Sequence, residues 1–271
     1  MPEGPEVRRS ADKIERAVAN APLRCIFEYH TLESVGDLFS NVQLTSIDTY
    51  GKAFVLHFSN GHSIYVHLQL YGRWKTGRLQ SYKPSRRTLR IRLETDTHYA
   101  ALYSATDIEI LTPQTVDEHR FIRKLGPDIL KKGYTTSHIS RRLGKTTFAR
   151  RSLGALLLDQ SVFAGLGNYL RSEILLRAGL LPSRKLGSLS PSEKTLLAKM
   201  IHETTHRAYK TAGITLDPEY VTIAKEQGWR RSQYRHFVFD REGSPCWICN
   251  GEIEKIQVSG RRLYLCTTCQ T

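Results

Sequence analysis

The 271-residue sequence predicts an α+β protein with more than one domain, and three observations lead to this prediction. An amphipathic helix pattern near the start is followed by short runs rich in β-branched residues. A middle region then has helical texture, and four cysteines in two close pairs stand near the end. We therefore expect an N-terminal helix with an antiparallel β-sandwich, then a helical domain, then a C-terminal β-hairpin held by the cysteines.

The first six residues, Met1-Pro2-Glu3-Gly4-Pro5-Glu6, carry the most informative chemistry. If Met1 is removed, the ring nitrogen of Pro2 becomes a secondary amine, and an α-amine titrates near pH ~8. Such an amine attacks an aldehyde-level carbon to form an iminium ion, and the neighbouring Glu3 and Glu6 can move protons. The alternative is an ordinary helix start, with proline in the first turn and acids near the positive end of the helix dipole.

A helix and then several strands follow this start. An apolar stripe at helical spacing predicts a helix from Pro5 to about Asn20. Asn60-Gly61 indicates a hairpin turn between two strands. The runs that we expect to form strands are 44–49, 53–58, 63–68, 88–94 and 98–104.

Charge favours a polyanionic partner, since 40 lysines and arginines against 26 acids give a net charge of +14. Nucleic acid and an anionic membrane surface both meet this description. The sequence has no run of 18 apolar residues, and its basic residues do not form one amphipathic helix, so nucleic acid is the better candidate. Five cysteines without an export signal indicate reduced thiols in the cytosol, and we expect a cytoplasmic protein.

The middle region begins after Leu125-Gly126-Pro127-Asp128, and helices are predicted at 153–160, 168–178 and 192–211. The segment Asp159–Arg171 spans the connection between the first two of these helices, and it contains Gly165 and Gly167. Asn168 is a suitable N-cap, and a helix start reached through a glycine turn can bind a phosphate. Many helical hairpins have glycine turns, but the stretch 129–158 beside it is basic and has no acid.

The cysteine pairs, Cys246-x2-Cys249 and Cys266-x2-Cys269, are separated by 16 residues. This spacing predicts one structural Zn²⁺ in a tetrahedron of thiolates, whereas two disulfides would need an oxidising compartment. The tip between the pairs carries Arg261 and Arg262, which indicates either a phosphate clamp or a solvated turn. Cys25 is left over, and we expect it to be a small buried hydrophobe.

Two further segments have both a functional and a purely structural interpretation when each is considered by itself. Lys52 follows Gly51 before a strand, and a single lysine is usually a solvated charge. Gln69-Leu70-Tyr71-Gly72 ends a strand, and it is either a wedge that fills space beside a ligand or a plain turn.

Together, in this order along nearly the whole chain, these motifs resemble the formamidopyrimidine-DNA glycosylase/endonuclease VIII family of base-excision repair enzymes. The resemblance implies a catalytic β-sandwich domain at 1–124, a helix–two-turn–helix DNA-binding domain at 125–228 and a zinc finger at 237–271. It also implies a bifunctional DNA glycosylase and abasic-site lyase that binds damaged double-stranded DNA, expected to act as a monomer. Tyr50 and Lys124 depart from the family pattern, where arginine is frequent at both positions.

The resemblance assigns a role to each candidate residue. Pro2 is the nucleophile that forms a Schiff base, assisted by Glu3, Glu6, Lys52 and Arg261, and the strand is cut by β,δ-elimination. The residues implied to bind DNA are Gln69, Leu70, Tyr71, Lys124, Asn168 and Arg171. Zinc is implied to be structural.

Gln69-Leu70-Tyr71 and the short stretch 213–239 are similar to the bacterial endonuclease VIII branch, which implies oxidised pyrimidines as substrates. An oxidised-purine glycosylase of the same family remains open, as does a non-catalytic protein that binds damaged DNA.

Overall fold

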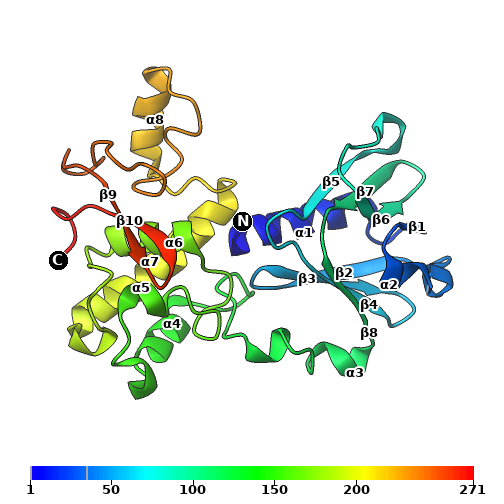
Figure 1. Ribbon diagram of the computed structural model, residues 1–271, viewed down its shortest axis with the longest axis horizontal. Helices are drawn as coiled ribbons and strands as arrows, with labels where there is room; N and C mark the ends of the chain where they lie inside the picture. The colour runs from blue at the N-terminus through cyan, green and yellow to red at the C-terminus, as the bar shows by residue number, and fades with distance from the viewer. Residues whose placement is uncertain (1, 35) are drawn as a thin grey trace. The chain divides into compact units, whose positions relative to one another are not determined.

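The computed structural model describes residues 2–34 and 36–271, so Met1, whose removal the catalytic hypothesis requires, lies outside the described residues. The chain divides into two compact units, Met1–Leu125 and Gly126–Thr271 (Figure 1). Among the residues that the structure describes, no helix is long and apolar enough to cross a bilayer.

The first unit begins with helix α1, Gly4–Val18, which buries one face formed by residues such as Val7, Ala11 and Ile14. Arg8 on the other side of the helix donates to the carboxylate of Glu15 (2.6 Å) and to the carbonyl oxygen of Ile47 (2.8 Å). Glu15 in turn accepts from the Ile47 N–H at 2.7 Å. Core packing and these bonds together fix α1 against strand β2, Leu44–Tyr50.

Two four-stranded antiparallel sheets form the rest of the first unit, in the orders β1–β6–β7–β5 and β2–β3–β4–β8. Inward side chains of both sheets and of α1 share one core, as in Leu56 of one sheet and Ile91 of the other. The predicted antiparallel β-sandwich is therefore confirmed. The remaining strands are β1 Arg24–Phe27, β3 Ala53–Phe58, β4 Ser63–His67, β5 Arg73–Arg78, β6 Leu89–Glu94, β7 His98–Tyr103 and β8 Asp107–Leu111.

The five strands expected from sequence agree with β2, β3, β4, β6 and β7 to within one residue at each end. The first unit also contains short helical elements. They are α2 His30–Glu33, η1 Gly36–Phe39, η2 Leu79–Ser81, α3 Pro113–Val116 and η3 Ile122–Lys124.

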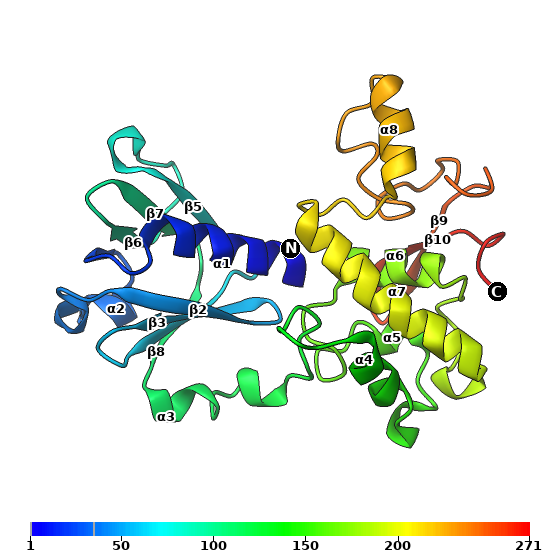
Figure 2. The ribbon, with the colours of Figure 1, turned by 180° about the vertical axis from the view of Figure 1, so that it is seen from behind.

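The second unit is a group of helices with a β-hairpin packed into the same core (Figure 2). Its central helix α6, Asn168–Arg177, is buried on nearly every side and packs against α7 and β10. Leu263 and Leu265 of the hairpin belong to the core that these helices share. The other elements are α4 Thr136–Leu143, η4 Thr146–Phe148, α5 Leu153–Leu156, η5 Leu186–Ser188, α7 Pro191–Lys210, α8 Pro218–Glu226, β9 Glu254–Val258 and β10 Arg261–Leu265.

Two of the helix boundaries that differ from the prediction have a clear cause in the hydrogen bonds. The helix expected at 153–160 ends at Leu156, because Asp159 accepts from the backbone N–H and the hydroxyl of Ser161 and so forms a turn. Helix α7 begins at Pro191 rather than Ser192, since Ser190 and Glu193 form a reciprocal capping box.

Candidate active site and nucleic-acid interface

The proposed nucleophile and its neighbouring acid stand at the start of α1. Pro2 is half-buried, and the next residue, Glu3, is only 5% exposed. The backbone N–H of Glu3 donates to the carboxylate of Glu6 at 3.1 Å, which fixes the first turn of the helix. The fold therefore holds a carboxylic acid out of bulk water directly beside residue 2.

Lys52 is half-buried in the turn between β2 and β3. The figures show this turn and the first turn of α1 at the same end of the first unit. Burial lowers the pKa of His67 on β4, Asp107 opposes that shift, and the charge of Lys52 adds to it. Lys52 thus contributes positive potential at the end of β4, where the segment 69–72 begins.

The segment Gln69–Gly72 connects β4 to β5 and presents apolar side chains to solvent. Leu70 is 64% exposed and Tyr71 is 72% exposed. Gln69 has a left-handed backbone with φ +49°, and its N–H donates to Nδ1 of His67 at 3.1 Å. Arg87 donates to the carbonyl oxygen of Tyr71 at 2.9 Å. A backbone held at both ends and tipped with two exposed apolar side chains can insert into an apolar gap.

Lys124 is exposed at the end of η3, near the boundary of the first unit. The structure therefore leaves its ammonium group accessible to solvent.

In the second unit, the two-turn segment between α5 and α6 is stabilised by Gln160. Its amide donates to the carbonyl oxygen of Leu166 at 2.7 Å and accepts from the Gly165 N–H at 3.1 Å. Gly165 has φ +93°, which favours glycine. The N–H of Gly165 is therefore used inside the turn, where it stabilises the approach to α6.

The segment Leu125–Asp128 packs against the same turn. The Gly126 N–H donates to Gln160 O (2.8 Å), and the Ala164 N–H donates to Pro127 O (3.0 Å). A Cβ on Gly126 would lie 2.5 Å from the carbonyl oxygen of Ser161, so only glycine fits. This motif therefore has a structural role in the second unit.

Asn168 is the first residue of α6, and Gly167 rather than Asn168 is the N-cap, so that part of the sequence prediction was wrong. The Asn168 side chain instead accepts from Arg171 at 3.4 Å through Oδ1. Asn168 remains half-buried at the helix start, where a phosphate could still approach it.

The prediction that Arg171 contacts DNA directly is contradicted, because its side chain is completely buried. Its guanidinium donates to the carbonyl oxygens of Gly154 (2.9 Å) and Arg262 (3.1 Å). These bonds join α5, α6 and β10. A buried cation bonded to carbonyl oxygens positions the hairpin, and no local sequence pattern indicates that this arginine points inward.

The hairpin turns at Ser259-Gly260, both of which have positive φ (53° and 70°), as a tight two-residue turn requires. Arg261 follows the turn immediately, and Arg261 and Arg262 are both exposed. The tip thus presents two guanidinium groups while Leu263 anchors the strand in the core.

Glu173 is a buried structural position that the sequence analysis did not identify. Its buried carboxylate accepts from the backbone N–H groups of Phe237 (2.8 Å), Val238 (2.9 Å) and Phe239 (2.9 Å). It also accepts from the Thr215 hydroxyl at 2.5 Å. Glu173 therefore fixes both ends of the stretch 213–239. A glutamate within the apolar helix 168–178 was the available signal.

The four C-terminal cysteines converge, with sulfur atoms that all lie within 4.8 Å of one another. Cys246 and Cys269 sulfurs are 3.9 Å apart, and those of Cys249 and Cys266 are 3.5 Å apart. Four thiolates at the Zn–S distance of about 2.3 Å in a tetrahedron stand about 3.8 Å apart. The residues therefore fit a tetrahedral metal ion. Cys25, the fifth cysteine, is half-buried and packs against the core of the first unit.

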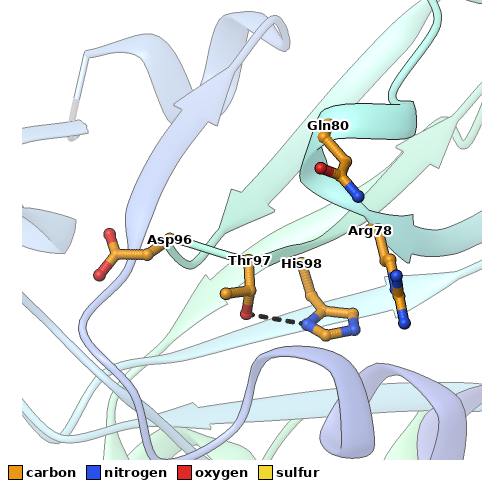
Figure 3. A pocket seen from close by; sticks show the side chains of 5 residues that line it. All are labelled: Arg78, Gln80, Asp96, Thr97 and His98. Carbon is orange, nitrogen blue, oxygen red and sulfur yellow. Dashed lines mark hydrogen bonds between the residues drawn. The ribbon is translucent and has the colours of Figure 1, made fainter.

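A surface hollow of about 380 Å³ lies elsewhere, beside β5 and the β6–β7 turn (Figure 3). It is lined by Arg78, Gln80, Asp96, Thr97 and His98, and Thr97 and His98 are hydrogen-bonded to each other at 2.9 Å. None of the predicted site residues lines this hollow, and its rim is largely exposed. We therefore place the candidate site at the residues described above.

Comparison with known proteins identifies the class. Residues 1–108 match the formamidopyrimidine-DNA glycosylase N-terminal domain, and residues 125–219 match the formamidopyrimidine-DNA glycosylase H2TH domain. The chain belongs to this family, whose members are DNA glycosylases with abasic-site lyase activity.

Within the family, the chain is similar to proteins named Endonuclease 8. It is 40% identical to that of Klebsiella pneumoniae subsp. pneumoniae and 38% identical to that of Escherichia coli O1:K1, over 271 residues and the whole of both chains. Its fold is similar to that of Lactococcus lactis Fpg in complex with abasic-site DNA, with a TM-score of 0.79, 21% identity and 99% of each chain covered.

Proposed function

We propose that this protein removes oxidised pyrimidines from double-stranded DNA and then cuts the strand by β,δ-elimination, with Pro2 as the covalent nucleophile. The observation that supports the proposal is the start of α1, where Glu3, the residue after Pro2, is buried and caps the helix. Full-length similarity to Endonuclease 8 proteins supports it.

The damaged base must leave the helix before any group can reach its sugar, at a cost of a few kcal/mol. Gln69, Leu70 and Tyr71 fill the gap that the base leaves. Aromatic stacking contributes about 1–3 kcal/mol per base, which offsets part of the cost. The high exposure of Leu70 and Tyr71 supports this role, because water solvates apolar side chains poorly.

Once Met1 has been removed, the Pro2 nitrogen attacks C1′ of the sugar, and the bond from C1′ to the base breaks. Glu3 assists sugar-ring opening and base loss by proton transfer, and Glu6 holds the turn that positions it. The resulting iminium ion withdraws electrons, so a proton leaves C2′ and the 3′ phosphate departs. A second proton loss, from C4′, releases the 5′ phosphate.

Cations hold the phosphates during these steps. Lys52, Lys124 and Arg261 supply the charges, and Asn168 offers a helix start. Arg261 lies beside the phosphate that leaves second and assists that elimination, whereas Arg171 acts indirectly by holding the hairpin backbone. The protein acts as a monomer.

One Zn²⁺ is bound by Cys246, Cys249, Cys266 and Cys269. It is a structural ion that stabilises the two cysteine turns at the base of the hairpin.

The preference for one kind of damaged base depends on whether a long loop can cover the base after it has left the helix, and this chain has little room for such a loop. The stretch 213–239 contains α8, and Glu173 bonds both of its ends to the second unit. Such a site selects lesions by how readily they leave the stack, and saturated pyrimidines, being non-planar, stack worst.

The test is single-turnover excision of thymine glycol and of 8-oxoguanine from matched duplexes at fixed salt, since binding is electrostatic. We expect thymine glycol to be excised faster. The control is the cleavage of an abasic site that replaces the lesion in each of the two duplexes. The rate of this cleavage should be the same in both. Faster excision of 8-oxoguanine would assign the chain to purine repair, and tight binding without excision of either base would indicate a non-catalytic protein.

A further inference from the structure

Helix α7 carries a motif that the proposed repair chemistry does not use. Its residues 202–206 read His202-Glu203-Thr204-Thr205-His206, which is the H-E-x-x-H spacing. Two histidines four residues apart lie on the same face of a helix, one turn from each other. In many zinc proteins this spacing supplies two imidazole ligands to one ion.

The structure places the two imidazole rings against each other. Their centroids are 4.0 Å apart, and the angle between the ring planes is 25°. Both side chains are partly exposed, so an ion can reach them from solvent. The opposite face of the helix is buried in the core of the second unit through residues such as Ile201 and Ala208. The helix backbone beneath the pair is therefore fixed.

One hydrogen bond also sets the protonation of a ring. Nδ1 of His206 lies 2.9 Å from the carbonyl oxygen of His202. Because a carbonyl oxygen can only accept, Nδ1 carries the hydrogen, and in the neutral ring the lone pair is on Nε2. Metal-binding histidines commonly donate their second N–H to a backbone carbonyl in this way, which orients the ligand nitrogen.

We propose that His202 and His206 form a second metal site, separate from the four cysteines, that binds a divalent transition-metal ion through two imidazole nitrogens. Imidazole favours Ni²⁺, Cu²⁺ and Zn²⁺ over Mg²⁺ and Ca²⁺. The spacing of the pair on one helix face allows both imidazole rings to turn toward a single ion, with water as the remaining ligands.

The site does not make the protein a zinc hydrolase. Catalytic zinc sites use three protein ligands and one open position. In the described part of the chain, the cysteine cluster is the one place where three or more such ligand groups come together. Glu203 lies 3.8 Å from Lys199, with which it forms an ion pair. The two histidines alone therefore provide a binding site of moderate affinity.

The experiment uses the full-length protein without a purification tag, with its native metal retained at the cysteines, and titrates it with Ni²⁺ by calorimetry. We expect one Ni²⁺ per chain, and either His202→Gln or His206→Gln should weaken binding by roughly tenfold or more. His138→Gln is the matched control, because His138 is exposed on helix α4 and should not change the affinity.

A spectroscopic measurement separates coordination from a general effect of the substitutions. The electron paramagnetic resonance spectrum of one equivalent of Cu²⁺ should show nitrogen coordination in the wild type and in His138→Gln, and lose it in the two α7 variants. If both α7 variants bind Ni²⁺ as the wild type does, or if the wild type does not bind it, the proposal is wrong.

Discussion

At the scale of single residues, the position of Glu3 leads to the sharpest prediction. Its carboxyl group is buried beside Pro2, and its backbone is fixed by Glu6. Replacing Glu3 with glutamine keeps the shape and removes the ability to transfer a proton. We expect Glu3→Gln to bind lesion DNA normally and to release the base about a hundredfold more slowly or worse, as is typical for loss of a general acid or base.

Glu33→Gln is the control, because Glu33 is an exposed glutamate on α2. Single-turnover base release and binding to an uncleavable lesion duplex are the two measurements. A Glu3→Gln variant with near wild-type base release would exclude the proton-transfer role.

A second residue predicts how stability depends on pH. His236 is buried against Tyr169 and Phe239, and burial, with a further contribution from Arg235, lowers its pKa to about 3. In the unfolded chain this histidine has its ordinary pKa of about 6.5. Between pH 6.5 and pH 3 the imidazole is therefore protonated in the unfolded state and neutral in the folded state. The free energy of unfolding therefore falls as pH falls through this window, by about 3 kcal/mol at pH 4 from this group alone.

Denaturant unfolding followed by the fluorescence of Trp229 and Trp247, which belong to the same cluster of the second unit, measures this dependence. His236→Gln should flatten the profile between pH 7 and pH 4, whatever its effect at pH 7. Equal slopes in the two proteins would show that His236 is protonated in the folded state.

The sequence predicted which residues form a site more reliably than it predicted the direction in which each side chain points. The cysteines were identified correctly because their spacing allows few other arrangements, and they converge as expected. The resemblance implies that Arg171 binds DNA, yet the buried helix α6 turns its side chain inward onto backbone carbonyl oxygens. Glu173 was overlooked because its partners are backbone N–H groups more than 60 positions away, which no local pattern reveals.

At the scale of elements, the five runs rich in β-branched and aromatic residues were located to within one residue, whereas strands β1, β5 and β8 and the short helices were not predicted. Helix α5 is a single turn because Asp159 offers the backbone a competing set of hydrogen bonds. Helix α4 was not predicted at all, since its eight residues are mostly polar and only Ile139 and Leu143 are buried.

The hairpin gives a prediction about metal removal. Structural zinc contributes about 10–16 kcal/mol of apparent binding energy in small modules, so chelation should release the turns around Cys246–Cys249 and Cys266–Cys269. Strand β10 has a second anchor, because Leu263 lies in the helical core and Arg171 bonds to Arg262. We expect faster hydrogen exchange in the two cysteine turns and weaker DNA binding, with slow exchange retained at Leu263.

Metal analysis of protein purified without chelators should give one zinc per chain. Exchange at Leu263 as fast as in the cysteine turns would show that the metal alone holds the hairpin. Unchanged exchange throughout would show that the cysteines hold no structural ion.

At the scale of the whole molecule, each of the two units contributes a different part of the proposed function. The first unit carries the proposed nucleophile, the proposed acid and the exposed Leu70 and Tyr71, and the second carries the helix start at Asn168 and the arginine tip. The net charge of +14 provides the attraction to DNA that both units need. In the proposed reaction, the covalent bond to the sugar forms at residue 2.

Borohydride trapping tests this claim most directly, because it reduces the Schiff base to a stable amine on an oligonucleotide with one thymine glycol. We predict a cross-link whose peptide map places the sugar on Pro2 as the N-terminal residue, with an undamaged duplex as the control. An adduct on a lysine, such as Lys52, or no cross-link despite strand cleavage, would rule out Pro2 as the nucleophile.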